Sequence, residues 1–269
     1  KYRALVEADI SLTEWEELKP GSPYYFLILR NEADLDEYML GWKVTDAFPV
    51  NSVGITTARD DLTIKWSSKE VEATVRDFAS LPTEEAREKY NLGKDARDWK
   101  VELAQKDLKD TKMNPDMISP VLYRPFDMRY TYYTGRSRGF HCMPRGEVMN
   151  HMLAGANLGL LVTRQTRDQW DILATQSIVG HKSLSAYDIT SLVPLYLYPA
   201  EGEMQFDGGK RRPNLNPEFV KAISEKLGLT FIEDGKGDLE QTFGPEDIFN
   251  YTYAVLHSPT YRIRYAELL

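Results

Sequence analysis

Apolar residues at helical spacing divide much of the chain into short helices. Val71, Val75 and Phe78 recur at i, i+4 and i+7, which indicates a helix with one apolar face. Ser67 precedes this run and Glu70 follows three residues later, the arrangement of a capping box at a helix start. Similar start, stop and periodicity signals predict helices over residues 34–42, 67–80, 83–90, 145–154, 217–227 and 245–257.

Runs rich in aromatic and aliphatic residues predict strands between these helices. The predicted strands cover residues 24–29, 62–66, 130–133, 159–163, 171–179 and 192–199. Prolines flank the last run, which favours a sheet-edge or exit strand because proline cannot donate to a ladder. Residues 93–112 are charge-rich and weakly apolar, so we expect an exposed helix there. The whole pattern predicts an α+β fold with a mixed, mostly antiparallel sheet flanked by helices.

The chain is long enough for one large domain or two small ones. Asn114-Pro115 interrupts the pattern, and we predict a boundary there that separates residues 1–118 from residues 119–269. The chain begins at Lys1 without a methionine and closes on a helical pattern without a cap. We therefore expect a piece of a longer protein, with no signal peptide.

Composition is that of an ordinary water-soluble protein, with 42% hydrophobic and 28% charged residues. The longest apolar stretch, at residues 158–162, is far shorter than the ~18 residues of a membrane span, so we expect no membrane partner. The single cysteine, Cys142, excludes a disulfide framework and fits a reducing cytoplasm.

Positive charge is concentrated in residues 123–167, called here the arginine zone. Seven arginines, no lysine and two acidic residues give it a formal charge of +5, in a chain of net charge −8. Arginine forks match phosphate oxygens and the guanine edge, and four tyrosines interleave with the first arginines, which suits packing against sugars and bases. The alternative is that these arginines pair with the many carboxylates elsewhere in the fold.

Motifs for catalysis are absent from the sequence. His141-Cys142 is the only Cys/His pair, too few ligands for zinc. A glycine pair at residues 155–159 precedes a predicted strand instead of following one, so the dinucleotide-binding geometry fails. Asn114-Pro115 shares only its first two residues with the Asn-Pro-Pro-Tyr motif of adenine methyltransferases. We therefore predict no catalytic residue and no metal site in this chain.

Six sequence blocks occur in an order that is far more specific than any one of them. They are Tyr123-Arg124-Pro125-Phe126-Asp127-x-Arg129, residues 144–152, Asn157-x-Gly159-Leu160, residues 194–199, Asn216-Pro217-Glu218-Phe219, and residues 245–262. This series resembles the C-terminal specificity region of type ISP restriction–modification enzymes, long single chains that join a nuclease, a helicase-like translocase, an adenine-N6 methyltransferase and a target recognition domain. The resemblance covers most of the chain and is looser over residues 1–118.

The resemblance implies a module that holds double-stranded DNA and reads a short asymmetric target. Residues 1–118 would link a methyltransferase core to a DNA target recognition domain at residues 119–269. The covalently linked methyltransferase, helicase and nuclease domains would be the partners, in a bacterial cytoplasm. S-adenosylmethionine would bind the upstream methyltransferase, so this part of an adenine-specific DNA methyltransferase with restriction activity would need no cofactor and be catalytically silent.

We expect DNA contacts from the arginine zone and the loop that follows it. The candidate residues are Arg124, Arg129, Arg136, Arg138, Arg145, Arg164, Gln165, Thr166, Arg167 and Lys182. The Arg164–Arg167 run is the candidate for base reading, since Gln suits adenine and Arg suits guanine; the others would clamp phosphates or fork onto guanine. The alternative for Arg124 and Arg129 is an internal salt bridge with Asp127.

Two other functions compete with DNA recognition. A protein-interaction or regulatory domain would also use exposed Tyr and Arg side chains, which are enriched at interface hot spots. A small-molecule enzyme is disfavoured because no set of nucleophile, base and metal ligands can be assembled from the motifs.

If Arg164 reads a base, its replacement by alanine costs roughly 1–3 kcal/mol of binding and relaxes preference at one target position. Competition binding with targets substituted at each position measures this. Equal weakening on every sequence would refute base reading at Arg164.

Overall fold

The structure is a computed structural model in which two compact units are distinguished, Trp42–Ser258 and the combination of Lys1–Gly41 with Pro259–Leu269. It describes residues 9, 11, 15–21, 25, 34–96, 98–163, 170–199, 211–266 and 268. The predicted strand at residues 24–29 and the Arg164–Arg167 run lie outside the described residues, apart from Tyr25.

The described residues of the smaller unit include the helices α2 (Leu35–Met39) and α11 (Pro259–Arg264). The Arg264 guanidinium binds the carboxylates of Asp34 at 3.0 Å and Glu37 at 2.5 Å. The Tyr265 hydroxyl donates to Glu37 at 3.0 Å. The predicted helix at residues 34–42 is confirmed over the span of α2.

The first sheet of the larger unit has the strand order β1-β8-β5-β6, all antiparallel. Its strands are β1 (Ser52–Val53), β5 (Gly159–Thr163), β6 (Leu173–Thr175) and β8 (Thr190–Pro194). The expectation that residues 192–199 form a sheet-edge or exit strand was wrong for residues 192–194, because β8 lies between β1 and β5. Proline is tolerated there because β1 pairs only with Ser191 and Leu192, so Pro194 lies beyond its end. Residues 196–197 form a separate short strand that pairs with residues 212–213.

The second sheet has the order β2-β4-β3-β7. Its strands are β2 (Ile64–Lys65), β3 (Ile118–Arg124), β4 (Asp127–Tyr132) and β7 (Ile178–Val179). β3 pairs with β7 in parallel and with β4 antiparallel, so the predicted mixed, mostly antiparallel character is confirmed. The predicted strand at residues 62–66 is shorter than expected, because helix α4 (Asp60–Thr63) takes its first two residues.

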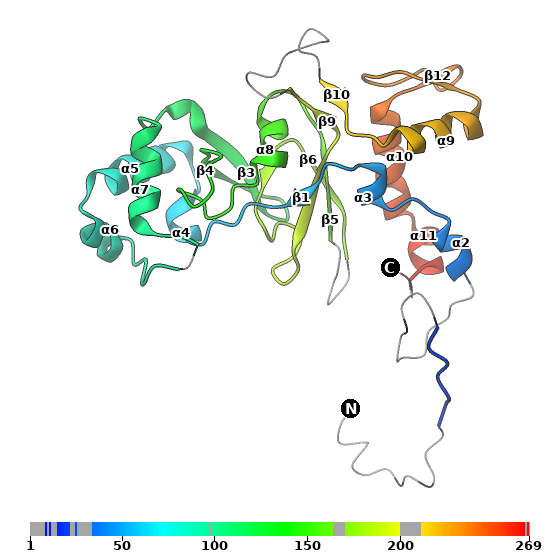
Figure 1. Ribbon diagram of the computed structural model, residues 1–269, viewed down its shortest axis with the longest axis horizontal. Coiled ribbons are helices and arrows are strands. Elements are labelled where there is room, and N and C mark those ends of the chain that lie inside the picture. The colour runs from blue at the N-terminus through cyan, green and yellow to red at the C-terminus, as the bar shows by residue number, and fades with distance from the viewer. Residues whose placement is uncertain are drawn as a thin grey trace. The chain divides into compact units, whose positions relative to one another are not determined.

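Three helices pack together beside β4: α5 (Ser68–Ser80), α6 (Thr83–Lys89) and α7 (Val101–Asp110) (Figure 1, left). The Ser67–Glu70 capping box is present at the start of α5. The expectation of an exposed helix within residues 93–112 was wrong, because Trp99, Val101 and Leu108 are completely buried. The charges that suggested exposure lie mostly on the opposite face of α7, but Asp107 is buried.

The other elements of the larger unit are short strands, turns and helices. They are α3 (Val44–Ala47), the 3-10 turn η2 (Pro115–Met117), α8 (Gly146–Leu153), β9 (Tyr196–Leu197), β10 (Arg212–Pro213), α9 (Pro217–Leu227), β11 (Thr230–Phe231), β12 (Thr242–Phe243) and α10 (Pro245–His257). The predicted helices at 145–154, 217–227 and 245–257 are therefore confirmed. Asn216 caps α9 and Gly228 ends it in the left-handed conformation, as the sequence predicts.

Three apolar cores hold this unit together, and the first sheet separates two of them. Leu160 and Val162 of β5 face the core formed with α10, whereas Leu161 faces the core closed by α8. Alternation along the strand therefore places β5 between two cores, which explains why its sequence is uninterruptedly apolar. The third core lies among α5, α6, α7 and β4.

The proposed division at residue 118 concerns function and stays a prediction. In the structure, residues on both sides of it belong to the same compact unit, Trp42–Ser258. β2 comes from the first part of the chain and pairs with β4 from the second.

The two sheets are joined where the chain leaves β1 and passes the end of β7. Gly54 donates to Thr190 at 3.0 Å, and the next residue, Ile55, donates to Val179 at 2.8 Å. A Cβ on Gly54 would lie 2.1 Å from the carbonyl oxygen of Gly180. That oxygen belongs to backbone held in the sheet, so only glycine fits at this crossing.

We expect Gly54→Ala to lower the free energy of unfolding by about 3 kcal/mol, because the added methyl group meets backbone that cannot yield. Gly180→Ala is the matched control, since its Cβ would meet nothing closer than Ser183 Oγ at 3.5 Å. Urea unfolding of both variants measures the difference, and similar losses in both would contradict the steric argument.

Candidate nucleic-acid interface

The hairpin of β3 and β4 carries two of the predicted arginines. Arg129 makes a fork to Asp127, with both N–O distances 2.8 Å, and its guanidinium carbon lies 3.2 Å from the centre of the Trp66 ring. The pKa of Asp127 is lowered, first by hydrogen bonds from Arg129. The structure thus gives Arg129 the salt bridge that the sequence left as an alternative.

Arg124, at the end of β3, has different partners. Its guanidinium lies 4.0 Å from the centre of the Tyr123 ring. It donates to the carbonyl oxygens of Tyr123 at 2.8 Å and Lys182 at 3.5 Å, and to the Tyr123 hydroxyl at 3.3 Å. Within the described ranges Arg124 forms no ion pair with a carboxylate, so its charge is not neutralised there.

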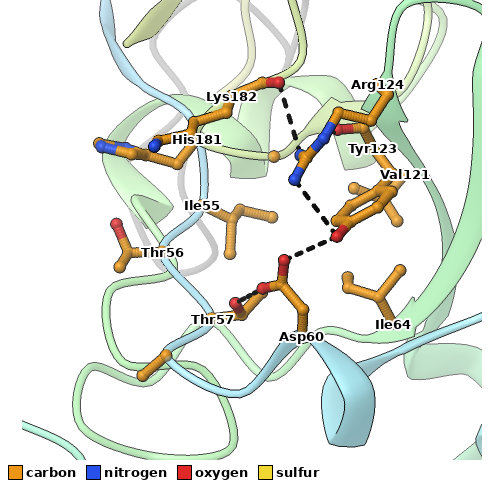
Figure 2. Close-up of a pocket in the computed structure, with 12 residues that line it drawn as sticks. Ile55, Thr56, Thr57, Asp60, Ile64, Val121, Tyr123, Arg124, His181 and Lys182 are labelled. Atoms are coloured by element: carbon orange, nitrogen blue, oxygen red, sulfur yellow. Dashed lines mark hydrogen bonds between the residues drawn. The ribbon is translucent and has the colours of Figure 1, made fainter. Parts of the chain in front are cut away.

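Arg124 and Lys182 line a pocket of about 370 Å³ near the crossing of the two sheets (Figure 2). Ile55, Ile64 and Val121 supply apolar walls. Its remaining lining comes from Thr56, Thr57, Ala58, Asp60, Tyr123, Gly180 and His181. The pocket therefore brings together three segments that are far apart in the sequence.

A chain of hydrogen bonds crosses the pocket (Figure 2). Arg124 donates to the Tyr123 hydroxyl, which donates to Asp60 at 2.8 Å, and Asp60 also accepts from Thr57. Burial and the bond to Asp60 raise the pKa of Tyr123, so the phenol stays protonated and donating. The pocket consequently offers cationic donors beside a carboxylate acceptor.

Arg145 adds a further cation close to His181. Burial lowers the pKa of His181, and the nearby charges of Arg145 and Lys182 lower it further. The backbone of Arg145 is left-handed, with φ 60°, and its buried Nε has no hydrogen-bond partner. Arg124, Arg145 and Lys182 thus form a group of cations that lack carboxylate partners in the described part of the protein; we call it the pocket cations.

Arg136 and Arg138 differ from the pocket cations because they pair with carboxylates near α7. Arg136 pairs with Asp110 at 2.6 Å and with Asp107 at 3.5 Å, and Arg138 pairs with Asp98 at 3.5 Å. Hydrogen bonds from Lys106 and Arg136 lower the pKa of Asp110. For this loop the carboxylate-pairing alternative describes the structure.

Buried Asp107 organises the loop that carries these two arginines. It accepts from the Phe140 amide at 2.8 Å and from Thr134 Oγ1 at 2.7 Å. A Cβ on Gly139 would lie 2.1 Å from Asp107 Oδ2, so the loop backbone closes directly onto this carboxylate.

The ten predicted contact residues therefore separate into groups. Arg124 and Lys182 line the pocket and Arg145 lies near His181. Arg129 is on the same hairpin as Arg124 but is paired with Asp127, and Arg136 and Arg138 are near α7. Arg164, Gln165, Thr166 and Arg167 lie outside the described residues. Sequence reasoning missed Asp60, His181 and Trp66, because their partners are distant in the chain and no local motif marks them.

Asn157 of the third block and His151 of the second block hydrogen-bond to the backbone of the fold. The Asn157 amide accepts from the backbone of Leu158 and Tyr196 and donates to the carbonyl oxygens of His151 and Tyr196, at 2.8–3.0 Å. His151 Nδ1 accepts from the Tyr198 amide at 3.1 Å. These side chains hold the backbone around β9.

Comparison with known families and structures agrees with this geometry. Residues 46–269 match the family described as the type ISP C-terminal specificity domain. The chain belongs to this family, as its sequence blocks indicated. No curated protein matches the chain.

Solved structures of similar fold come from complexes with DNA. One is a DrdV–DNA complex (TM-score 0.64, 22% identity), covering 98% of this chain and 26% of that one. A second is a nuclease-deletion mutant of the type ISP restriction–modification enzyme LlaGI with a DNA substrate mimic. Its TM-score is 0.58 at 19% identity, and the match covers 96% of this chain and 23% of that one. The ATP-dependent type ISP enzyme LlaBIII bound to DNA gives 0.53 and 17%, covering 81% and 14%. The chain thus spans about a quarter of the first two.

Neither a metal cluster nor a membrane span is found in the described part of the chain. No three His, Cys, Asp or Glu side chains gather there as metal ligands would. No helix within the same residues has the length and apolar character needed to span a bilayer.

His141 is a buried side chain beside strand β4 of the second sheet. Its Nε2 lies 2.8 Å from Thr131 Oγ1, and its Nδ1 has no hydrogen-bond partner. Burial lowers the pKa of His141 to about 4. The imidazole is therefore neutral at pH 7, as a structural residue would be.

We expect stability to fall as the pH drops from about 6.5 towards 4, because the unfolded chain binds a proton at His141 that the folded chain refuses. The slope from this group is about 1.4 kcal/mol per pH unit at its steepest. Urea unfolding between pH 7 and 4.5 measures it, with His141→Gln as comparison. A variant with the same pH dependence as the parent would contradict this assignment.

Proposed function

We propose that this chain is the DNA sequence-recognition module of a type ISP restriction–modification enzyme. The observation that carries the proposal is the family match over residues 46–269. In this role the chain holds duplex DNA so that a methyltransferase elsewhere in a longer protein methylates an adenine at N6. S-adenosylmethionine, the helicase and the nuclease belong to that longer protein, which acts in the cytoplasm.

The pocket cations are the proposed phosphate contacts. An arginine already paired with a carboxylate gains little from a phosphate, because one ion pair replaces another. Arg124 and Lys182 have no such partner to exchange among the described residues. They therefore contribute more to backbone binding than Arg129, Arg136 or Arg138 do.

Phosphate contacts set the register of the DNA, and other residues must read its bases. Arg164, Gln165, Thr166 and Arg167 keep this role in the proposal, since their side chains suit guanine and adenine edges. A β-bridge pairs the backbone of Thr56, which lines the pocket, with the backbone of Met143. This pairing supports the backbone beside the proposed phosphate contacts.

The family match gives no support to the alternative of a protein-interaction domain.

Binding of duplex DNA by the full-length protein should weaken with salt, with a log–log slope of about −0.9 for each phosphate neutralised. Fluorescence anisotropy at several salt concentrations measures the slope. We expect Arg124→Ala and Lys182→Ala each to reduce its magnitude by about 0.9, and Arg136→Ala to reduce it less.

Arg76→Ala is the control, because Arg76 is an exposed arginine of α5 whose partner is Glu72 at 2.8 Å. Its slope should equal that of the parent. Binding without salt dependence, or equal changes in all four variants, would contradict the assignment of the pocket cations.

A further inference from the structure

The tip of the β3–β4 hairpin exposes an aromatic ring on strained backbone. Arg124 pairs with Asp127, so Pro125 and Phe126 form a two-residue turn. Phe126 has φ 60° and its side chain is 86% exposed. Proline before a residue of positive φ defines a turn that normally takes Gly or Asn at the second position.

A phenylalanine at this position lowers the stability of the fold, and no contact within the described residues offsets that loss. The left-handed conformation is unfavourable by roughly 1–2 kcal/mol for a residue with a Cβ. No buried contact compensates, because the ring faces solvent. An outlier of this kind is a reason to look for a function outside the folded chain.

Neighbouring residues restrict the conformation of the turn. Pro125 fixes its own φ, and the Asp127–Arg129 fork lies directly after the turn with its distances of 2.8 Å. Trp66, itself 66% exposed, stacks on Arg129. A ring on such a support loses little conformational freedom when it meets a ligand.

The positive charge beside the turn favours a negatively charged ligand. Arg124 adjoins the turn and donates to the backbone carbonyl of Lys182, so one guanidinium without a carboxylate partner among the described residues lies beside Phe126. A two-stranded ribbon is narrow enough to enter a DNA groove, and apolar side chains from such elements can separate base pairs and kink the duplex.

We propose that Phe126 is a wedge that inserts between neighbouring base pairs of the bound DNA. This inference rests on the proposed function, since it requires that the chain bind duplex DNA. Arg124 neutralises a phosphate beside the inserted ring, and the Arg129–Trp66 stack supports the hairpin behind the turn.

The test uses the full-length protein and duplexes with 2-aminopurine at successive positions of the bound site. The parent should raise the fluorescence at one base step, where the ring separates the stack. Phe126→Gly should abolish that increase and weaken binding roughly ten-fold, the range expected for loss of one base–aromatic stack. The adenine extruded by the methyltransferase keeps its own signal in both proteins.

A loss of stability would not explain this result. Glycine adopts a positive φ without strain, so the thermal midpoint of Phe126→Gly should not fall below that of the parent. Leu239→Gly is the matched control: Leu239 is also exposed, at 63%, with φ 58°, but it stands between Asp238 and Glu240. It should leave DNA binding and fluorescence unchanged.

Three outcomes separate the hypotheses. Equal fluorescence of parent and Phe126→Gly at every step, with DNA binding retained, overturns the wedge and leaves the proposed function standing. A lower thermal midpoint for Phe126→Gly without any fluorescence change also overturns it, by indicating that the ring packs on protein. Absence of DNA binding by the parent overturns both.

Discussion

One close approach of two backbones, at Gly54 and Gly180, joins the two sheets of the larger unit. The chain crosses there from the first sheet to the second, and hydrogen bonds from residues 54 and 55 reach strands of both. Because a Cβ on Gly54 would meet the Gly180 backbone, the close approach of the sheets at this point requires glycine, and side chains of both sheets pack in one core around it. The pocket with Asp60, Tyr123 and His181 lies beside this point and is lined in part by Gly180.

The distribution of charge partners changes the meaning of the arginine zone. A formal charge of +5 suggests a uniformly positive surface, but Arg129, Arg136 and Arg138 are paired with carboxylates. Among the described arginines of the zone, Arg124 and Arg145 have no carboxylate partner, and Lys182 lines the pocket with Arg124 from outside the zone. Position along the chain thus gives a poorer guide to the electrostatic field than the ion-pair geometry does.

Local signals predicted the helices well, because a cap and its partner are only a few residues apart. Ser67 with Glu70, and Asn216 with Pro217, determine helix starts without help from distant contacts. The burial of α7 was not predicted because Ala104 and Gln105 complete its inward stripe and neither is a bulky apolar residue. The bond between Tyr123 and Asp60 joins residues 63 positions apart, so no local pattern could reveal the pocket. The family was predicted from ordered blocks, yet Asn157 within them is scaffold.

Contacts with buried Asp107 hold the conformation of the loop that carries Arg136 and Arg138. Asp107 binds its backbone and Thr134, while the two arginine side chains extend over the surface as half-exposed groups. Substitutions at those two surface positions therefore leave the backbone anchors in place. A lineage of such proteins can vary the chemistry presented by this loop while its foundation stays constant, which allows surface properties to diverge without a new fold.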